Sequence, residues 1–216
     1  AGLAALFVLY ILPRGDGGFV ETSGHKLKIG ETAFVDMRAP FGITGSWLLD
    51  PNNITIAAAG GDFTGAQVTG WLGSSDVIIT TSDMDNGYST DGGSSYTPAG
   101  SAGDGDIFVN DSITWSSHKL TLDAWRNIKI NRELFGSAAA QLALYYGQGA
   151  VNAGNTATYK VSAPVNLGAG NNFFTKLGND VSETAYTVIT SLGEAGSATG
   201  TDLQGINGNK GGNYAL

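Results

Sequence analysis

The residues best suited to acid–base chemistry in this sequence are its two histidines. His25 and His118 each precede a lysine and stand just before a short apolar run that we expect to form a strand. Ser23 or Ser117 would be the nucleophile if a Ser-His-Asp triad existed, but such a triad depends on a geometry that a sequence does not specify. We therefore interpret both histidines as solvated turn residues and predict no catalytic role for them.

A group of aspartates is the second candidate for chemistry. Asp83 and Asp85 stand in an Asp-x-Asp-x-Gly pattern, and Asp104 and Asp106 flank a glycine. Carboxylate oxygens of this kind bind Ca²⁺, but the first pattern lacks the glutamate that completes an EF-hand loop. A pair of these carboxylates would also suit a glycosidase or a polysaccharide lyase. Because aspartate and glycine are common turn formers, we favour a structural role over metal binding or catalysis.

The four tryptophans raise a third kind of chemistry, because exposed aromatic rings stack on sugars. Trp115 belongs to an alternating strand pattern and is expected in the core. Trp47 should lie on the face opposite to Leu48. Trp125 is followed by Arg126 and is the best candidate for an exposed aromatic at a corner, so this pair is our candidate glycan contact. For all four tryptophans, packing in the core or at a corner is the favoured alternative.

The composition excludes several classes of protein. The 216 residues include 33 glycines and no cysteine, with 42% hydrophobic residues, 14% charged residues and a formal net charge of −8. Without cysteine the chain has no disulfide scaffold, thiolate metal site or cysteine nucleophile. Its acidic balance argues against nucleic acid as a partner, since phosphates need a basic surface. These features indicate a β-rich, turn-rich protein that works outside the cell and needs no cofactor.

Short alternating runs between clusters of Gly, Asn, Asp and Ser predict an all-β fold. No stretch keeps a 3.6-residue period, so long helices are not expected. The apolar start of the chain, residues 1–12, is too short for a membrane span of about 20 residues, and no stable membrane insertion is expected. We treat residues 1–16 as a separate segment: a signal remnant, a buried strand or a boundary of a fragment.

A repeat of about 21 residues runs through the strand pattern. Apolar residues recur at this step in two places: Leu27, Ala33 and Val35 precede Leu48, Ile54 and Ile56, while Ile107, Ile113 and Leu120 precede Ile128, Leu134 and Leu142. Three apolar positions per period predict three short strands per coil. Coils of this length stacked on one another are typical of a parallel β-helix.

Polar residues follow the same repeat. Asn110, Asn131 and Asn152 recur at steps of 21 residues, and we expect them to form a hydrogen-bonded ladder along the stack. Residues 82–105 are long, polar and without pattern, which predicts a loop that protrudes from the coils. We therefore expect coils over residues 17–146. A C-terminal β-rich segment, in which the period fades, should cover residues 147–216.

Two blocks of sequence resemble the filamentous haemagglutinin family of large secreted adhesins. The first is Gly17-Gly18-Phe19-Val20-Glu21-Thr22-Ser23-Gly24, and the second is Trp47-Leu48-Leu49-Asp50-Pro51-Asn52-Asn53-Ile54-Thr55-Ile56. Later coils between residues 105 and 131, and the tail from residue 186 to 206, are similar to this family as well. The resemblance covers about residues 17–216.

The resemblance implies a right-handed parallel β-helix that serves as a stiff adhesive stalk on the surface of a Gram-negative bacterium or in its surroundings. It implies a host-cell or surface receptor, or a glycan, as the partner, and export by an outer-membrane transporter of the two-partner type. The family's secretion domain, with its Asn-Pro-Asn-Gly and Asn-Pro-Asn-Leu motifs, is absent, and Pro51-Asn52-Asn53 is no equivalent. We therefore expect an internal piece of a longer adhesin. A carbohydrate-active β-helix enzyme is the alternative.

Overall fold

A computed structural model describes residues 15–23, 29–30, 32–50, 53–81, 105–137 and 139–216. His25, Leu27, Asp83, Asp85 and Asp104, and the predicted loop except Gly105, lie outside these residues. Most of the regular secondary structure in the described chain is β-strand, and the strands form three sheets, A, B and C, which agrees with the all-β class. In the same residues no helix has the length and apolar character needed to cross a bilayer.

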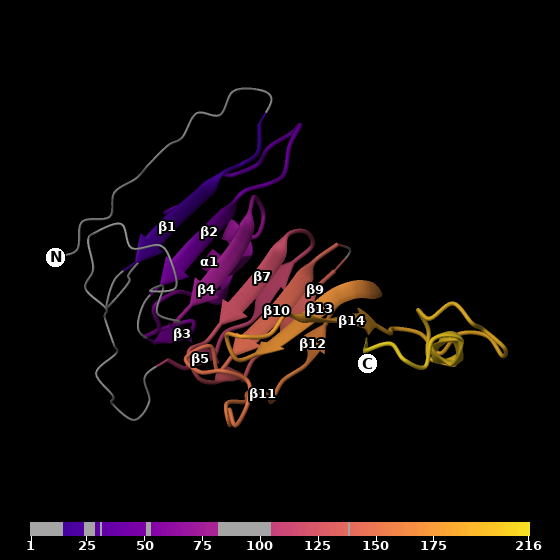
Figure 1. Cartoon of the computed structure of the whole chain (residues 1–216). Helices are drawn as coiled ribbons and strands as arrows, with labels where there is room; N and C mark the ends of the chain where they lie inside the picture. Colours follow the sequence, from indigo (N-terminus) through magenta and orange to yellow (C-terminus); the bar gives the residue numbers. More distant parts are fainter. Residues whose placement is uncertain (1–14, 24–28, 31, 51–52, 82–104, 138) are drawn as a thin grey trace.

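Sheet A has eight strands in the order β1-β2-β4-β7-β10-β13-β14-β15, and Figure 1 shows most of them side by side. These strands are β1 (Phe19–Ser23), β2 (Ser46–Asp50), β4 (Asp76–Thr80), β7 (Lys119–Asp123), β10 (Gln141–Tyr146), β13 (Gly170–Leu177), β14 (Thr184–Val188) and β15 (Tyr214–Ala215). Sheet B has the order β11-β8-β5-β3, with β3 (Ile54–Ile56), β5 (Ile107–Val109), β8 (Ile128–Ile130) and β11 (Tyr159–Val161). Sheet C has the order β12-β9-β6, with β6 (Ile113–Trp115), β9 (Leu134–Gly136) and β12 (Val165–Asn166).

From β5 onward the chain gives one strand to each sheet in turn. The strands β5, β6 and β7 enter sheets B, C and A, and β8–β10 and then β11–β13 repeat this order. Every strand pair between successive rounds is parallel. We call one such round a coil.

The predicted step of 21 or 22 residues is confirmed for the first two of these coils. The register pairs are Ile107–Ile128, Ile113–Leu134 and Leu120–Leu142. The step then widens, since Ile128 pairs with Tyr159, 31 residues later. The pattern is thus lost from the sequence near residue 147 although the sheets continue beyond it.

The 21-residue step predicted for residues 27–56 is wrong. Ile54 pairs with Ile107 and not with Ala33, which belongs to no strand. The backbone carbonyl of Ala33 instead accepts a hydrogen bond of 3.2 Å from Trp71 Nε1. The segment around Ala33 therefore covers the start of the stack and does not form a coil of its own.

A short helix, α1 (Gly65–Trp71), takes the place of a sheet C strand between β3 and β4. A capping box starts it: the Thr64 side chain accepts from Gln67 N, and the Gln67 side chain accepts from Thr64 N. Thr69 Oγ1 then accepts from Thr114 N of β6 at 3.0 Å. The helix therefore covers the edge of sheet C and satisfies a backbone donor there.

The interior of the coils is filled by apolar side chains from all three sheets. Trp115 is only 4% exposed, as predicted. Trp47 and Leu49 belong to the core, and strand alternation turns Leu48 to the other face. The expected opposition of Trp47 and Leu48 is confirmed, but it is Trp47 that fills the interior, where its Nε1 donates to Thr22 Oγ1 at 2.9 Å.

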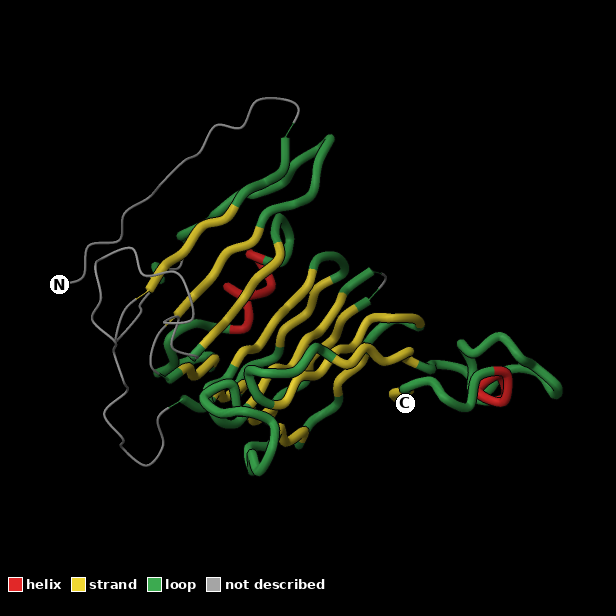
Figure 2. The backbone as a smooth tube through the Cα atoms, in the orientation of Figure 1, coloured by secondary structure: helices red, strands yellow, loops and turns green. Residues whose placement is uncertain are grey.

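The C-terminal part extends sheet A alone. Strand β14 pairs antiparallel with β13, and β15 pairs parallel with β14, while β11 and β12 remain the last strands of sheets B and C. Val161 of β11 is 47% exposed, although its register partner Ile130 is fully buried. The chain between β14 and β15 projects from this end and carries the short 3-10 helix η1 (Gln204–Gly208), as Figure 2 shows.

Candidate functional site

The connections that lead from sheet A to sheet B differ in length, and we call the region where they lie the A–B corner. Residues 51–53 connect β2 to β3, residues 81–106 connect β4 to β5, residues 124–127 connect β7 to β8, and residues 147–158 connect β10 to β11. The short connection over residues 124–127 therefore lies between two longer ones along the stack. In solenoid proteins such insertions gather on one face, which is often the binding face.

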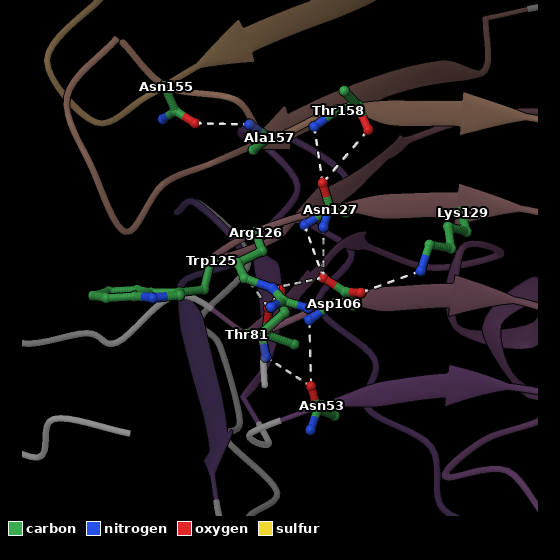
Figure 3. Close-up of polar contacts among 11 residues, drawn as sticks. Asn53, Thr81, Asp106, Trp125, Arg126, Asn127, Lys129, Asn155, Ala157 and Thr158 are labelled. Carbon is green, nitrogen blue, oxygen red and sulfur yellow. Dashed lines mark hydrogen bonds and ion pairs between the residues drawn. The ribbon is translucent and has the colours of Figure 1, made fainter. Parts of the chain in front are cut away.

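Trp125 stands on the short connection over residues 124–127 and is held there through its backbone. Its N–H donates to Thr81 Oγ1 at 3.1 Å, and its carbonyl accepts from Gly149 N at 3.0 Å. Figure 3 shows the indole pointing away from the strands. The ring is partly exposed, which fits the predicted exposed aromatic at a corner.

Gly149 lies directly against this indole. A Cβ atom at Gly149 would stand 2.2 Å from Trp125 Cε2, so only glycine permits the contact. Part of the ring is thereby covered by the longer corner, Gly105 lies against the start of the side chain, and the ring also lines a cavity of about 360 Å³. Besides Trp125 and Gly149, its lining includes Arg126, Asn127 and residues 155–157. The cavity combines one aromatic surface with amide, hydroxyl and backbone groups.

Arg126 turns back from the corner toward a buried carboxylate (Figure 3). Its Nε donates to Asp106 Oδ1 at 3.1 Å, and Lys129 Nζ lies 3.3 Å from Asp106 Oδ2. Asn127 donates to the same Oδ1 through its backbone N and through Nδ2, both at 3.1 Å. Burial alone would raise the pKa of the Asp106 carboxyl, but the bonds from Arg126 and Asn127 outweigh it and hold this pKa below its usual value.

The Asp106 side chain is one member of a row that runs along the corner. Asn53 Oδ1 accepts from Asp106 N at 3.3 Å, Asp106 Oδ1 accepts from Asn127 N, and Asn127 Oδ1 accepts from Thr158 N at 2.9 Å. Each of the four residues directly precedes a sheet B strand, so they stack in register. We call this row the corner ladder; it aligns each coil with the next.

The sequence did not reveal the corner ladder, because its steps are unequal. Asn53 and Asp106 are 53 residues apart, Asp106 and Asn127 are 21 apart, and Asn127 and Thr158 are 31 apart. The four residues share one feature: each stands directly before a sheet B strand. This feature can be recognised only after the strands have been aligned with one another.

The predicted asparagine ladder is correct for two of its three members. Asn131 Nδ2 donates to Asn110 Oδ1 at 2.8 Å. Asn152 is not part of this ladder: its Nδ2 donates to the carbonyl of Leu177, and its N–H donates to Asp180 Oδ1. The longer corner carries Asn152 away from the position that the 21-residue step predicts for it.

Of the predicted calcium ligands, only Asp106 lies in the described chain. Both of its oxygens accept from protein donors, as described above, so a cation there would compete with Arg126 and Lys129. Among the residues that the structure describes, no three acidic or histidine side chains lie close enough to hold a metal ion.

His118 differs from the solvated turn residue that we predicted. It is half-buried, and its backbone has a φ of +72°. Its Nδ1 lies 2.7 Å from the carbonyl of Leu72 at the end of α1, and 3.2 Å from Ser117 Oγ. As the donor to Leu72, Nδ1 carries a proton and is not a base for the Ser117 hydroxyl.

The A–B corner therefore presents polar and aromatic groups that can contact a ligand, while the carboxylate of Asp106 is held in ion pairs with Arg126 and Lys129. An aromatic ring, a guanidinium group, amides and hydroxyls are the groups that recognise a sugar, whose apolar face stacks on an indole and whose hydroxyls need donors and acceptors. Comparison of the chain with protein-family models, with curated proteins and with solved structures found no match.

Proposed function

We propose that residues 46–177 form a right-handed parallel β-helix. The support is the rotation of strands among three sheets and the parallel register between successive coils. Right-handedness follows from the general preference of parallel strand–crossover–strand connections for that hand. In this proposal α1 replaces one strand of an early coil, and β14 and β15 are additions to sheet A.

We infer that this rod is an adhesive segment of a secreted or surface-bound bacterial protein similar to filamentous haemagglutinin. Its role is to bind a receptor or glycan and to hold that contact at a distance from the cell, without catalysis. The family resemblance supports the adhesive role. The single observation that carries the binding site is the position of Trp125, partly exposed on a rigid short corner beside a polar cavity.

The test is a glycan array probed with the protein and with a Trp125→Ala variant. Loss of the indole should weaken binding of recognised glycans at least tenfold, because stacking of the sugar face is lost. Phe135→Ala is the matched control, since Phe135 is an aromatic residue of sheet C that is 44% exposed. Its removal should leave binding unchanged.

Two results would contradict the proposal. Release of reducing sugar from a bound glycan would show a carbohydrate-active enzyme in place of an adhesin. Equal binding by Trp125→Ala and the parent protein would place the contact away from the A–B corner.

A further inference from the structure

The outer face of sheet B carries one row of side chains that begins with Thr55 of β3, which pairs with Phe108. Phe108 of β5 pairs with Lys129 of β8, and Lys129 pairs with Lys160 of β11. Residues paired in this way are about 4.8 Å apart along the stack. We call Phe108, Lys129 and Lys160 the sheet B strip. Phe108 is partly buried, whereas Lys160 is exposed.

Positive charge accumulates on this strip in a chain of net charge −8. Lys129 Nζ lies 4.7 Å from the centre of the Phe108 ring and shares Asp106 with Arg126. In the part of the chain that the structure describes, Lys160 forms no ion pair. Two cations, Arg126 and Lys129, therefore share one buried carboxylate, and Lys160 adds a further positive charge to the row.

This arrangement is unfavourable for the isolated chain. Like charges directly opposite each other on neighbouring strands destabilise a sheet. Lys129 and Lys160 occupy such positions, and no acidic side chain of the strip separates them. An anionic ligand on this face would remove the repulsion, and the positive potential of the strip would favour its approach.

We propose that the sheet B strip binds an acidic polysaccharide, a chain of uronic acids, that runs along the stack. Consecutive carboxylates contact Lys129 and Lys160, and the apolar face of a neighbouring sugar lies on Phe108. A polyuronate carries one carboxylate per sugar, so a chain that lies along the stack brings repeated negative charges to the two lysines. Duplex DNA fits less well, because its dense phosphates would meet an acidic protein outside the strip. The inference rests on the proposed adhesive rod, but it uses a different face from the Trp125 site.

The test measures binding of an oligogalacturonate of defined length, with its neutral methyl ester and a DNA duplex as comparison probes. The parent protein should bind the acid form best, and added salt should weaken that binding. Lys129→Gln and Lys160→Gln should each reduce affinity about threefold and the double variant about tenfold, as for exposed ion pairs. Lys210→Gln, which removes an exposed charge outside the strip, is the matched control and should have no effect.

Three outcomes would overturn the strip as a polyuronate site. The first is equal affinity for the methyl ester, and the second is equal affinity for the DNA duplex. The third is undiminished binding by the double lysine variant, with melting curves confirming that it is folded. If that variant binds normally but Trp125→Ala does not, the strip fails while the proposed corner site stands. If only the lysine variants lose binding of the oligogalacturonate, the strip stands, and the glycan array with Trp125→Ala decides the corner site separately.

Discussion

At the scale of single residues, Asp106 shows how one buried group serves several neighbours. Its side chain is 4% exposed, and it accepts hydrogen bonds from Arg126, Asn127 and Lys129. From the sequence, Asp106 was a candidate ligand for Ca²⁺, because a carboxylate beside glycine occurs both in metal-binding loops and in structural turns. The two roles differ in which donors surround the carboxylate, and spacing does not specify that.

The charge of Asp106 should make stability depend on pH. A pKa held below its usual value means that the carboxylate stabilises the fold above about pH 4 and ceases to do so as the pH falls through its folded-state pKa. Asp106→Asn should therefore lower the free energy of unfolding by about 1–3 kcal/mol at pH 7. The difference from the parent should shrink toward pH 3, as urea unfolding at both pH values would measure.

Glu194→Gln is the control for this comparison, since Glu194 is exposed. Its stability should match that of the parent at both pH values. An Asp106→Asn deficit of the same size at pH 3 and pH 7 would mean that packing of the amide is responsible, and not the lost charge.

At the scale of elements, periodicity predicted strands well and predicted their partners only where the corners are short. The coils that contain Ile107 and Ile128 keep the 21-residue step, so their pairing was readable from the sequence. Ile54 pairs with Ile107 across a long connection, and no periodic pattern survives an insertion of that size. The candidate glycan contact was predicted in part. Trp125 faces outward as expected, while the side chain of Arg126 is directed to Asp106.

The helix α1 escaped prediction because it is seven residues long and too short to show a period. Its start carries a recognisable signal, the Thr64 and Gln67 of a capping box, but such a signal needs an apolar helical pattern after it to be decisive. A helix is tolerated at this position because α1 covers the edge of sheet C, where no further strand follows in the described chain.

Two glycines of α1 should respond in opposite directions to the same substitution. Gly70 has open space around its Cβ position, so Gly70→Ala should stabilise the protein by about 0.5–1 kcal/mol through helix propensity. Gly65 is in close contact with the next coil, and a Cβ there would stand 2.0 Å from the carbonyl oxygen of Ser112. Gly65→Ala should therefore lower the melting temperature, while Gly70→Ala raises it. Two shifts of the same sign would contradict the placement of α1 against β6.

At the scale of the whole molecule, stability should decline toward the C-terminal end of the stack. Stacked coils contribute mainly through contacts with their neighbours, and the last strands of sheets B and C have a neighbour on one side only in the described chain. Ile130 and Val161 are register partners with very different exposure.

Alanine substitutions at these two positions would measure the decline. Ile130→Ala should cost about 2–5 kcal/mol of unfolding free energy, as expected for a fully buried aliphatic residue. Val161→Ala should cost less than about 1 kcal/mol, because that side chain is already half in solvent. Chemical denaturation of both variants gives the comparison. Equal losses would mean that the end of the stack is covered in solution.

The corner ladder has a consequence for how such a protein can change over evolutionary time. The next strand enters in the same register after the short connection (residues 124–127) and after the long one (residues 147–158). Its position is set by hydrogen bonds from Asn127 N and Thr158 N to the preceding coil, whatever the length of the loop. Loop length and coil alignment are thus inherited separately. If the corner binds a glycan as proposed, one loop can be exchanged for another, with a new specificity, while the stacked strands keep their register.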